Sequence, residues 1–218
     1  MDTVYSQLEE QPRTSTGNFW HKKIYPNQIW LDGLYMAQPF YMQYEAEYNG
    51  CKNCEDSYQQ FLQVYDRMRD PLNGLYYHAY DDSRQMFWCD KVTGLSENFW
   101  LRAMGWYAMA LIDTMEVMPE SMTCQKARLN AIYKELIDAM LPYQDQATGM
   151  WYQVVNRGGI APNYLEESGS AIFAYVIMKS VRLHYLPDDY FKYGQKAFEG
   201  ICSTYLSEKD GSLQLGGI

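Results

Sequence analysis

Residues 97–118 read ENFWLRAMGWYAMALIDTMEVM, and this segment is the clearest guide to the architecture. Apolar side chains lie on nearly every face of it. One stripe steps in threes and fours through Leu101, Met104, Ala108, Leu111, Ile112 and Met115. Such a pattern predicts a helix that is buried on several sides. Pro119 lacks a backbone donor and ends it, so we expect an inner helix over Glu97–Met118.

The same arrangement recurs on both sides of this segment. Two more segments are apolar nearly all round, Leu31–Tyr48 and Tyr164–Leu186. Each of the three is followed by a helical pattern with a clear polar face: Asp56–Arg69, Thr123–Met140 and Asp188–Leu206. Aromatic stretches that begin with a glycine lie between these pairs, at Gly17, Gly74, Gly149 and Gly211. We therefore expect a unit of extended loop, inner helix and outer helix, repeated three times.

A repeat of helix pairs with buried inner members predicts an all-α toroid or solenoid, in which each pair covers the apolar face of its neighbour. Residues 3–10 resemble the end of an outer helix, and residues 215–218 follow the last pair without a polar cap. We expect both ends of the array to be cut, and residues 1–218 to form a single, partial domain.

The charge balance limits the partners. The 218 residues carry 27 acidic and 18 basic side chains, a formal net charge of -9. A surface this acidic repels phosphate backbones and anionic lipid, so we expect neither nucleic acid nor a membrane as a partner. Aromatic residues make up 16% of the chain, more than a core needs. Flat aromatic rings are also what cover the apolar faces of sugars.

The five cysteines show no regular framework. Cys51-Lys-Asn-Cys54 has neither a second pair nor a histidine partner, so a zinc site is not expected. We predict free thiols in a reducing compartment. Residues 1–12 also lack the basic and apolar regions of a signal peptide, so we expect a cytoplasmic protein.

Unusual polar and aromatic side chains gather just before the inner helices and in their first turns, where a ring of helix pairs presents its mouth. They are His21, Lys22, Lys23, Asp32, His78, Asp81, Asp82, Arg84, Trp100, Arg102, Trp106, Asn163, Glu166 and Glu167. Aromatic faces beside carboxylates and a few cations suit the binding of sugars, especially acidic ones.

Each of these residues also has a structural explanation. Asp32 begins a helix, where capping is the commoner use of aspartate, although its apolar flanks would disfavour the ionised form, as a general acid requires. Arg102 lies on a buried helix, so it must meet a carboxylate, either internal or on a ligand. His21 and His78 could be structural, and Asp81 and its neighbour are predicted to form a solvated turn.

Four motifs in order carry a resemblance to a known family. They are Phe19-Trp-His-Lys-Lys-Ile-Tyr-Pro26, Gln28-Ile-Trp-Leu-Asp-Gly-Leu-Tyr-Met36, Phe99-Trp-Leu-Arg-Ala-Met-Gly-Trp106 and Asn163-Tyr-Leu-Glu-Glu-Ser-Gly-Ser-Ala171. The chain resembles the unsaturated rhamnogalacturonyl hydrolases, glycoside hydrolase family 105, along nearly its whole length. The resemblance implies an (α/α)6 barrel, which agrees with the threefold repeat of helix pairs.

The resemblance also implies roles for particular residues. Asp32 matches the catalytic aspartate of the family, and six others match substrate-binding positions: His21, Lys22, His78, Trp100, Arg102 and Trp106. A second important aspartate of the family lies upstream of the part covered here. No metal or other cofactor is implied.

The implied reaction needs only one carboxylate. Pectin lyases leave a terminal uronic acid with a C4–C5 double bond, and protonation at C4 allows water to add at C5. The hemiketal then opens and releases the neighbouring sugar, with Asp32 as acid and then base. Two alternatives remain open at this point. One is an unsaturated glucuronyl hydrolase acting on glycosaminoglycan fragments, and the other is an inactive, sugar-binding chain.

Overall fold

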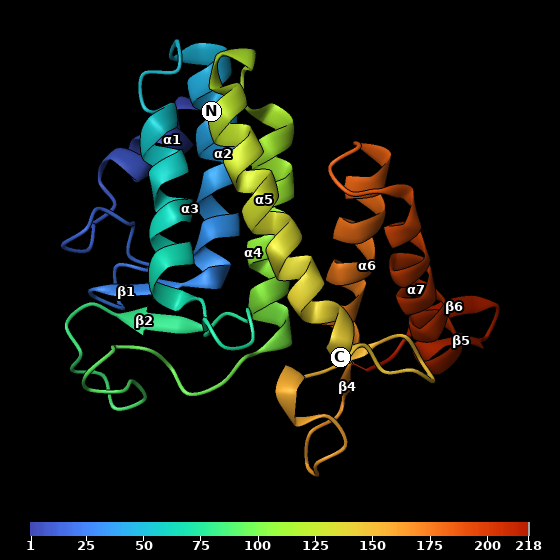
Figure 1. Ribbon diagram of the computed structural model, residues 1–218. Helices are drawn as coiled ribbons and strands as arrows, with labels where there is room; N and C mark the ends of the chain where they lie inside the picture. The colour runs from blue at the N-terminus through green and yellow to red at the C-terminus, as the bar shows by residue number, and fades with distance from the viewer. Residues whose placement is uncertain (218) are drawn as a thin grey trace.

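The computed structural model describes residues 1–217 and is mostly helical (Figure 1). Its α-helices are α1 (Asp2–Glu9), α2 (Leu31–Tyr48), α3 (Cys54–Met68), α4 (Leu101–Val117), α5 (Thr123–Met140), α6 (Glu167–Arg182) and α7 (Phe191–Tyr205). Four 3-10 turns accompany them, η1 (Glu120–Met122), η2 (Leu141–Tyr143), η3 (Val155–Arg157) and η4 (Asp188–Tyr190). None of the helices in this described part combines the length and apolarity needed to cross a bilayer.

The helices form three consecutive hairpins, and the inner members lie next to one another. Helix α4 packs against α2 on one side and α6 on the other, while α3, α5 and α7 each pack on the preceding inner helix (Figure 1). Helix α1 lies against α2, as the end of a preceding pair would. The predicted order of loop, inner helix and outer helix is thus confirmed for all three units.

Two inner helices begin later than predicted. Helix α4 starts at Leu101 instead of Glu97, because Trp100 forms an extended bridge with Val154. Helix α6 starts at Glu167 instead of Tyr164, because the preceding residues pair as a strand. Helical periodicity continued through both segments, so the sequence pattern did not reveal these backbone pairings.

Short antiparallel pairs connect the loops at the ends of the helices. Strand β1 (Gln28–Trp30) pairs with β2 (Ala79–Asp81), and β3 (Trp151–Tyr152) pairs with β4 (Leu165–Glu166). A hairpin of β5 (Leu206–Lys209) and β6 (Ser212–Leu215) follows α7. The β1–β2 pair matters most for the candidate site, because it brings the start of α2 beside the segment around residue 78.

Much of the aromatic content is core. The largest fully buried side chains include Trp151, Tyr76, Tyr107 and Tyr133. The hydroxyl of Tyr133 donates to the carbonyl of Val176 at 2.8 Å, so its polar atom is satisfied. Burial raises the pKa of both Tyr107 and Tyr133. The excess of aromatic residues over core needs is therefore smaller than the composition suggests.

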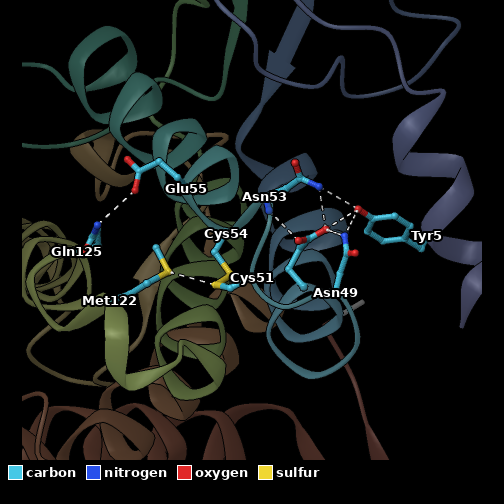
Figure 2. Close-up of a disulfide and its surroundings, with 9 residues drawn as sticks. Tyr5, Asn49, Cys51, Asn53, Cys54, Glu55, Met122 and Gln125 are labelled. Carbon is cyan, nitrogen blue, oxygen red and sulfur yellow. Dashed lines mark hydrogen bonds between the residues drawn. A yellow bond between two sulfur atoms is a disulfide. The ribbon is translucent and has the colours of Figure 1, made fainter.

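Cys51 and Cys54 form a disulfide, so the prediction of free thiols is wrong for this pair (Figure 2). Cys89, Cys124 and Cys202 are free. The chain leaves α2 in a left-handed turn, with Cys51 at a φ of 61°, and Cys54 is the first residue of α3. This turn folds the two thiols back on each other, a geometry that residue spacing alone does not reveal.

A buried carboxylate beside the disulfide fastens α1 to the α2–α3 junction. Glu45 is fully buried and accepts hydrogen bonds from the Tyr5 hydroxyl, from Asn49 Nδ2 at 2.8 Å and from the Asn53 amide at 2.7 Å. Figure 2 shows the three partners converging from α1 and from the turn. Burial by itself pushes the pKa of Glu45 upward, but these hydrogen bonds outweigh it and lower the pKa.

Candidate functional site

The centre of the candidate site is a contact between Asp32 and His78. Asp32 Oδ2 lies 3.1 Å from His78 Nε2, and their side chains are 18% and 22% exposed. The antiparallel pairing of Trp30 with Ala79 produces this contact. Asp32 follows Trp30 by two residues, and His78 directly precedes Ala79. The capping position of α2 is Trp30, so the alternative in which Asp32 is simply the helix cap is wrong.

Trp30 is an aromatic wall that three neighbouring rings contact. The His21 ring stacks on it at 4.7 Å with an interplanar angle of 4°, and His78 meets it edge-on at 5.0 Å. Tyr25 also stacks on Trp30, at 5.2 Å, and Lys22 Nζ lies 5.8 Å from the Tyr25 ring centroid. The predicted residue His21 therefore contacts Trp30 directly, and Lys22 lies near Trp30 by way of the Tyr25 ring.

Burial lowers the pKa of His21, and the nearby charges of Lys22 and His78 lower it further, while the charge of Asp32 opposes the shift. His21 Nδ1 is buried and has no hydrogen-bond partner among residues 1–217. A neutral imidazole is consequently the favoured form at neutral pH.

Trp100 and Arg102 extend the row of contacts from His78 to helix α6. The rings of His78 and Trp100 are 4.7 Å apart, and the Arg102 guanidinium lies 4.3 Å from the Trp100 centroid. Arg102 Nη1 donates to Glu166 Oε1 at 2.6 Å and to Ser168 Oγ at 3.0 Å. The expectation that Arg102 meets a carboxylate is confirmed, and the partner is internal. The arginine side chain is 34% exposed and Glu166 only 4%.

Trp106 lies one helical turn beyond Arg102 on α4. It packs against Tyr35 of α2 at 5.0 Å between ring centroids. Tyr35 itself follows Asp32 by almost one turn, so these two side chains lie on one face of α2. Arg102 and Trp106 lie on one face of α4 in the same way. Tyr35 was missed in the sequence, although its i+3 spacing from Asp32 was a signal that could have identified it.

Several other candidates turn out to be structural. The Asp81 carboxylate is fully buried and accepts from the Ser83 hydroxyl at 2.7 Å and from the Gln85 and Met86 amides at 2.7 and 2.8 Å. Burial favours a higher pKa for Asp81, yet these bonds lower it overall. The prediction of a solvated turn is therefore wrong for this residue. Asp82 accepts from the Ser15 amide at 2.8 Å.

The remaining polar candidates also make local contacts. Asn163 Oδ1 accepts from the Val154 amide at 3.0 Å, and Glu166 caps α6 by accepting from the Gly169 amide at 2.6 Å. Glu167 is buried beside Glu166, and burial followed by that neighbouring charge raises its pKa. Lys23 Nζ lies 3.9 Å from an oxygen of Glu10, and Arg84 is exposed in the loop after β2.

Trp30 lines two cavities of about 320 Å³ each. The first lies between α1 and α2 and is lined by His21 and Lys22. The second is lined by Trp30, His78, Ala79, Trp88, Ser96, Glu97, Asn98 and Trp100. Trp88 was not predicted, although an aromatic pair in a polar loop, with Phe87 before it, was a usable signal. Nowhere in residues 1–217 do three or more His, Cys, Asp or Glu side chains gather as a metal site would require.

The whole chain matches a known family. A sequence profile described as Glycosyl Hydrolase Family 88 matches residues 1–218. A protein of Agrobacterium fabrum, Protein Atu3128, is 34% identical over 188 residues, which are 84% of this chain and 79% of that protein. The unsaturated rhamnogalacturonyl hydrolase YesR of Bacillus subtilis is 29% identical over 94% of this chain and 56% of its own length.

Solved structures agree with the sequence matches. A glycoside hydrolase of family 105 from C. acetobutylicum superposes with a TM-score of 0.94 at 43% identity, covering 98% of this chain and 59% of that one. The chain thus spans little more than half the length of these two longer relatives. The matched enzymes are (α/α)6 barrels, so the predicted all-α class and barrel fold are confirmed.

Proposed function

The chain belongs to glycosyl hydrolase family 88, and on that premise we propose that it hydrolyses unsaturated galacturonyl–rhamnose oligosaccharides derived from pectic rhamnogalacturonan. The observation that carries the proposal is the Asp32–His78 contact of 3.1 Å in a site walled by Trp30 and Trp100. The likeness to YesR, an unsaturated rhamnogalacturonyl hydrolase, supports the choice of substrate.

Asp32 is the acid of the proposed reaction. It protonates C4 of the C4–C5 double bond, which leaves an oxocarbenium-like centre at C5. The resulting Asp32 carboxylate then accepts a proton from the water that adds at C5. The hemiketal so formed opens spontaneously to a carbonyl and releases the neighbouring sugar. His78 holds the Asp32 carboxyl in place through the contact at Oδ2.

The other residues position the unsaturated uronic acid. Arg102 and Lys22 supply positive charge for its carboxylate. A protein with a net charge of -9 needs such a local group of cations to bind an anion. Trp100 and Trp106 offer apolar faces to the ring, and His21 contributes a neutral imidazole beside Trp30. Because the guanidinium is already oriented by Glu166, little side-chain freedom is lost when the substrate binds.

Two features of the whole chain belong to the same proposal. Residues 1–218 act as one catalytic domain, which the continuous core cluster from Ile29 to Ala197 supports. The proposed compartment is the cytoplasm, where Cys89, Cys124 and Cys202 would remain reduced, and the Cys51–Cys54 disulfide is the feature that argues against it. Detection of the native protein in periplasmic or secreted fractions would contradict the second feature.

The function is tested by comparing two unsaturated disaccharides under identical conditions. Loss of the ultraviolet absorbance of the double bond is followed for galacturonyl–rhamnose and for a glucuronyl–hexosamine fragment of a glycosaminoglycan. We expect the absorbance to fall at least tenfold faster with the first. Faster loss with the second would identify a glucuronyl hydrolase, and binding without any loss would identify an inactive sugar-binding protein.

A further inference from the structure

The second cavity continues beyond the residues that hold the unsaturated sugar. A further cavity of about 420 Å³ is lined by Tyr77, Trp88, Cys89, Asp90, Thr93, Leu95, Ser96 and Glu97. Trp88, Ser96 and Glu97 belong to both cavities, so the two meet at these side chains. The two adjoining cavities, together called the groove, extend from His78, which contacts Asp32, to the loop after β2.

The loop that carries Trp88 is held rigidly on both sides. The Asp81 carboxylate accepts from the Met86 amide at 2.8 Å, and Cys89 forms an antiparallel bridge with Ser96. Gly94 closes the loop with a φ of 80°, and a Cβ there would lie 2.6 Å from the Asp81 carbonyl oxygen. Rigid aromatic side chains bind at low cost in conformational entropy, so this loop is organised in advance for a ligand.

Apart from His78, the charged side chains that line the groove are carboxylates. Glu97 and Asp90 are the ionisable carboxylates among its lining residues, and the Glu97 side chain is 78% exposed. The nearest cation to Glu97 is Arg157, at 3.8 Å between Nη2 and Oε1. The cationic side chains proposed to bind the uronic acid, Lys22 and Arg102, lie outside this lining. A second anionic sugar would be repelled here, and a neutral sugar would not.

We propose that Trp88 is the stacking platform for the second sugar of the substrate and that Glu97 selects a neutral sugar at that place. This inference rests on the proposed function, because it assumes that the unsaturated uronic acid lies at Asp32. The indole face covers the apolar face of the pyranose. The Glu97 carboxylate accepts hydrogen bonds from its hydroxyls and disfavours a neighbouring carboxylate.

Binding is measured first, in the Asp32→Asn background, by calorimetry with two unsaturated disaccharides. One carries rhamnose as the second sugar, and the other is unsaturated digalacturonate. We expect Trp88→Ala to weaken binding of the rhamnose disaccharide about tenfold, and Trp88→Phe to stay within about threefold. Phe87→Ala is the matched control, because Phe87 is the preceding residue, is 91% exposed and lines neither cavity. Equal affinities of the Trp88→Ala and control variants would overturn the platform.

Selectivity is measured next, as the ratio of kcat/KM for the two disaccharides. Glu97→Gln is expected to raise the value for digalacturonate several-fold and to lower that for the rhamnose disaccharide modestly, because the neutral amide is a weaker acceptor for the sugar hydroxyls. The gain should shrink at high salt, since the side chain is exposed and screened. An unchanged ratio would overturn the role of Glu97. Failure of the wild type to consume either disaccharide would instead contradict the proposed function, and the calorimetry would still report on Trp88.

Discussion

Arg102 shows how a single side chain serves both the fold and the proposed chemistry. Its guanidinium donates to the buried Glu166 and lies over the Trp100 ring, yet a third of the side chain stays exposed. An arginine held in this way can also bind a carboxylate of the substrate, because the guanidinium has five donors and only part of them is engaged.

Replacement Arg102→Ala is expected to raise KM for the unsaturated disaccharide at least tenfold, with a smaller effect on kcat. It should also destabilise the fold by about 1–3 kcal/mol, because the buried Glu166 would lose its cation. Steady-state kinetics and urea unfolding check both effects. Arg102→Lys keeps the charge and should recover part of the affinity. A fall in kcat alone would contradict the binding role.

His21 predicts a pH dependence of stability. Its pKa in the folded protein is lowered from the ordinary 6.5, chiefly by burial. Below that ordinary value the unfolded chain binds a proton that folded His21 resists, so stability must fall as the pH drops through about 6.5. Above it both states are neutral, and the contribution is fully present.

Replacement His21→Phe keeps an aromatic ring against Trp30 and removes the titration. We expect the variant to lose less stability than the wild type between about pH 7.5 and 5.5. Thermal unfolding at a series of pH values measures the difference. Parallel curves for the two proteins would show that His21 is not buried in its neutral form.

At the scale of single elements, the disulfide spans only two residues. Closing so short a loop removes little entropy from the unfolded chain, so its stabilising effect should be about 2 kcal/mol or less. Reduction is expected to raise the number of titratable thiols from three to five and to lower the unfolding midpoint slightly. The double variant Cys51→Ser, Cys54→Ala should be insensitive to reductant. A loss well above about 4 kcal/mol would contradict the prediction.

Helix α7 packs closely against the loop around Thr148 because Gly200 has no side chain. A Cβ at this position would lie 1.7 Å from the Thr148 carbonyl oxygen. The segment cannot retreat easily, because the Thr148 amide and hydroxyl both donate to Asp145 at 2.8 Å. Packing at this point is therefore backbone against backbone.

We expect Gly200→Ala to destabilise the protein by about 3 kcal/mol. Gly105→Ala is a suitable comparison, because the new methyl group would meet the Ile172 side chain at 3.0 Å, and that side chain can shift. Its cost should be about 1 kcal/mol. Urea unfolding of both variants tests the ranking, and equal losses would mean that the α7 contact is looser than the structure indicates.

Across the whole molecule, the sequence predicted the helices better than the connections between them. Apolar periodicity located all six helices of the hairpins, and α2 and α5 begin and end at the predicted residues. The β1–β2 pair was not predictable from periodicity, because its partners are about fifty residues apart in the chain. That pair is what brings Asp32 and His78 together, so their contact could not be derived from the sequence alone.

The site residues differ in how far the sequence identifies them. Asp32, His78 and Arg102 stood out as polar groups in apolar surroundings, a local signal that one sequence can carry. Trp88 became a candidate only because it lines the same cavity as His78, which the sequence does not reveal. Asp81 was predicted to lie in a solvated turn, but its buried carboxylate accepts from the amides of Gln85 and Met86. The residue types around Asp81 do not indicate that the loop folds back in this way.

We propose above that Asp32 donates the proton in the hydration of an unsaturated uronic acid. The most direct test compares wild-type protein with Asp32→Asn on the unsaturated galacturonyl–rhamnose disaccharide. It follows the ultraviolet absorbance of the double bond together with binding by calorimetry. We predict that the wild type consumes the double bond, whereas Asp32→Asn binds the disaccharide with similar affinity and turns over at least a thousandfold more slowly, about 4 kcal/mol in the barrier. Wild-type turnover by Asp32→Asn would contradict the claim.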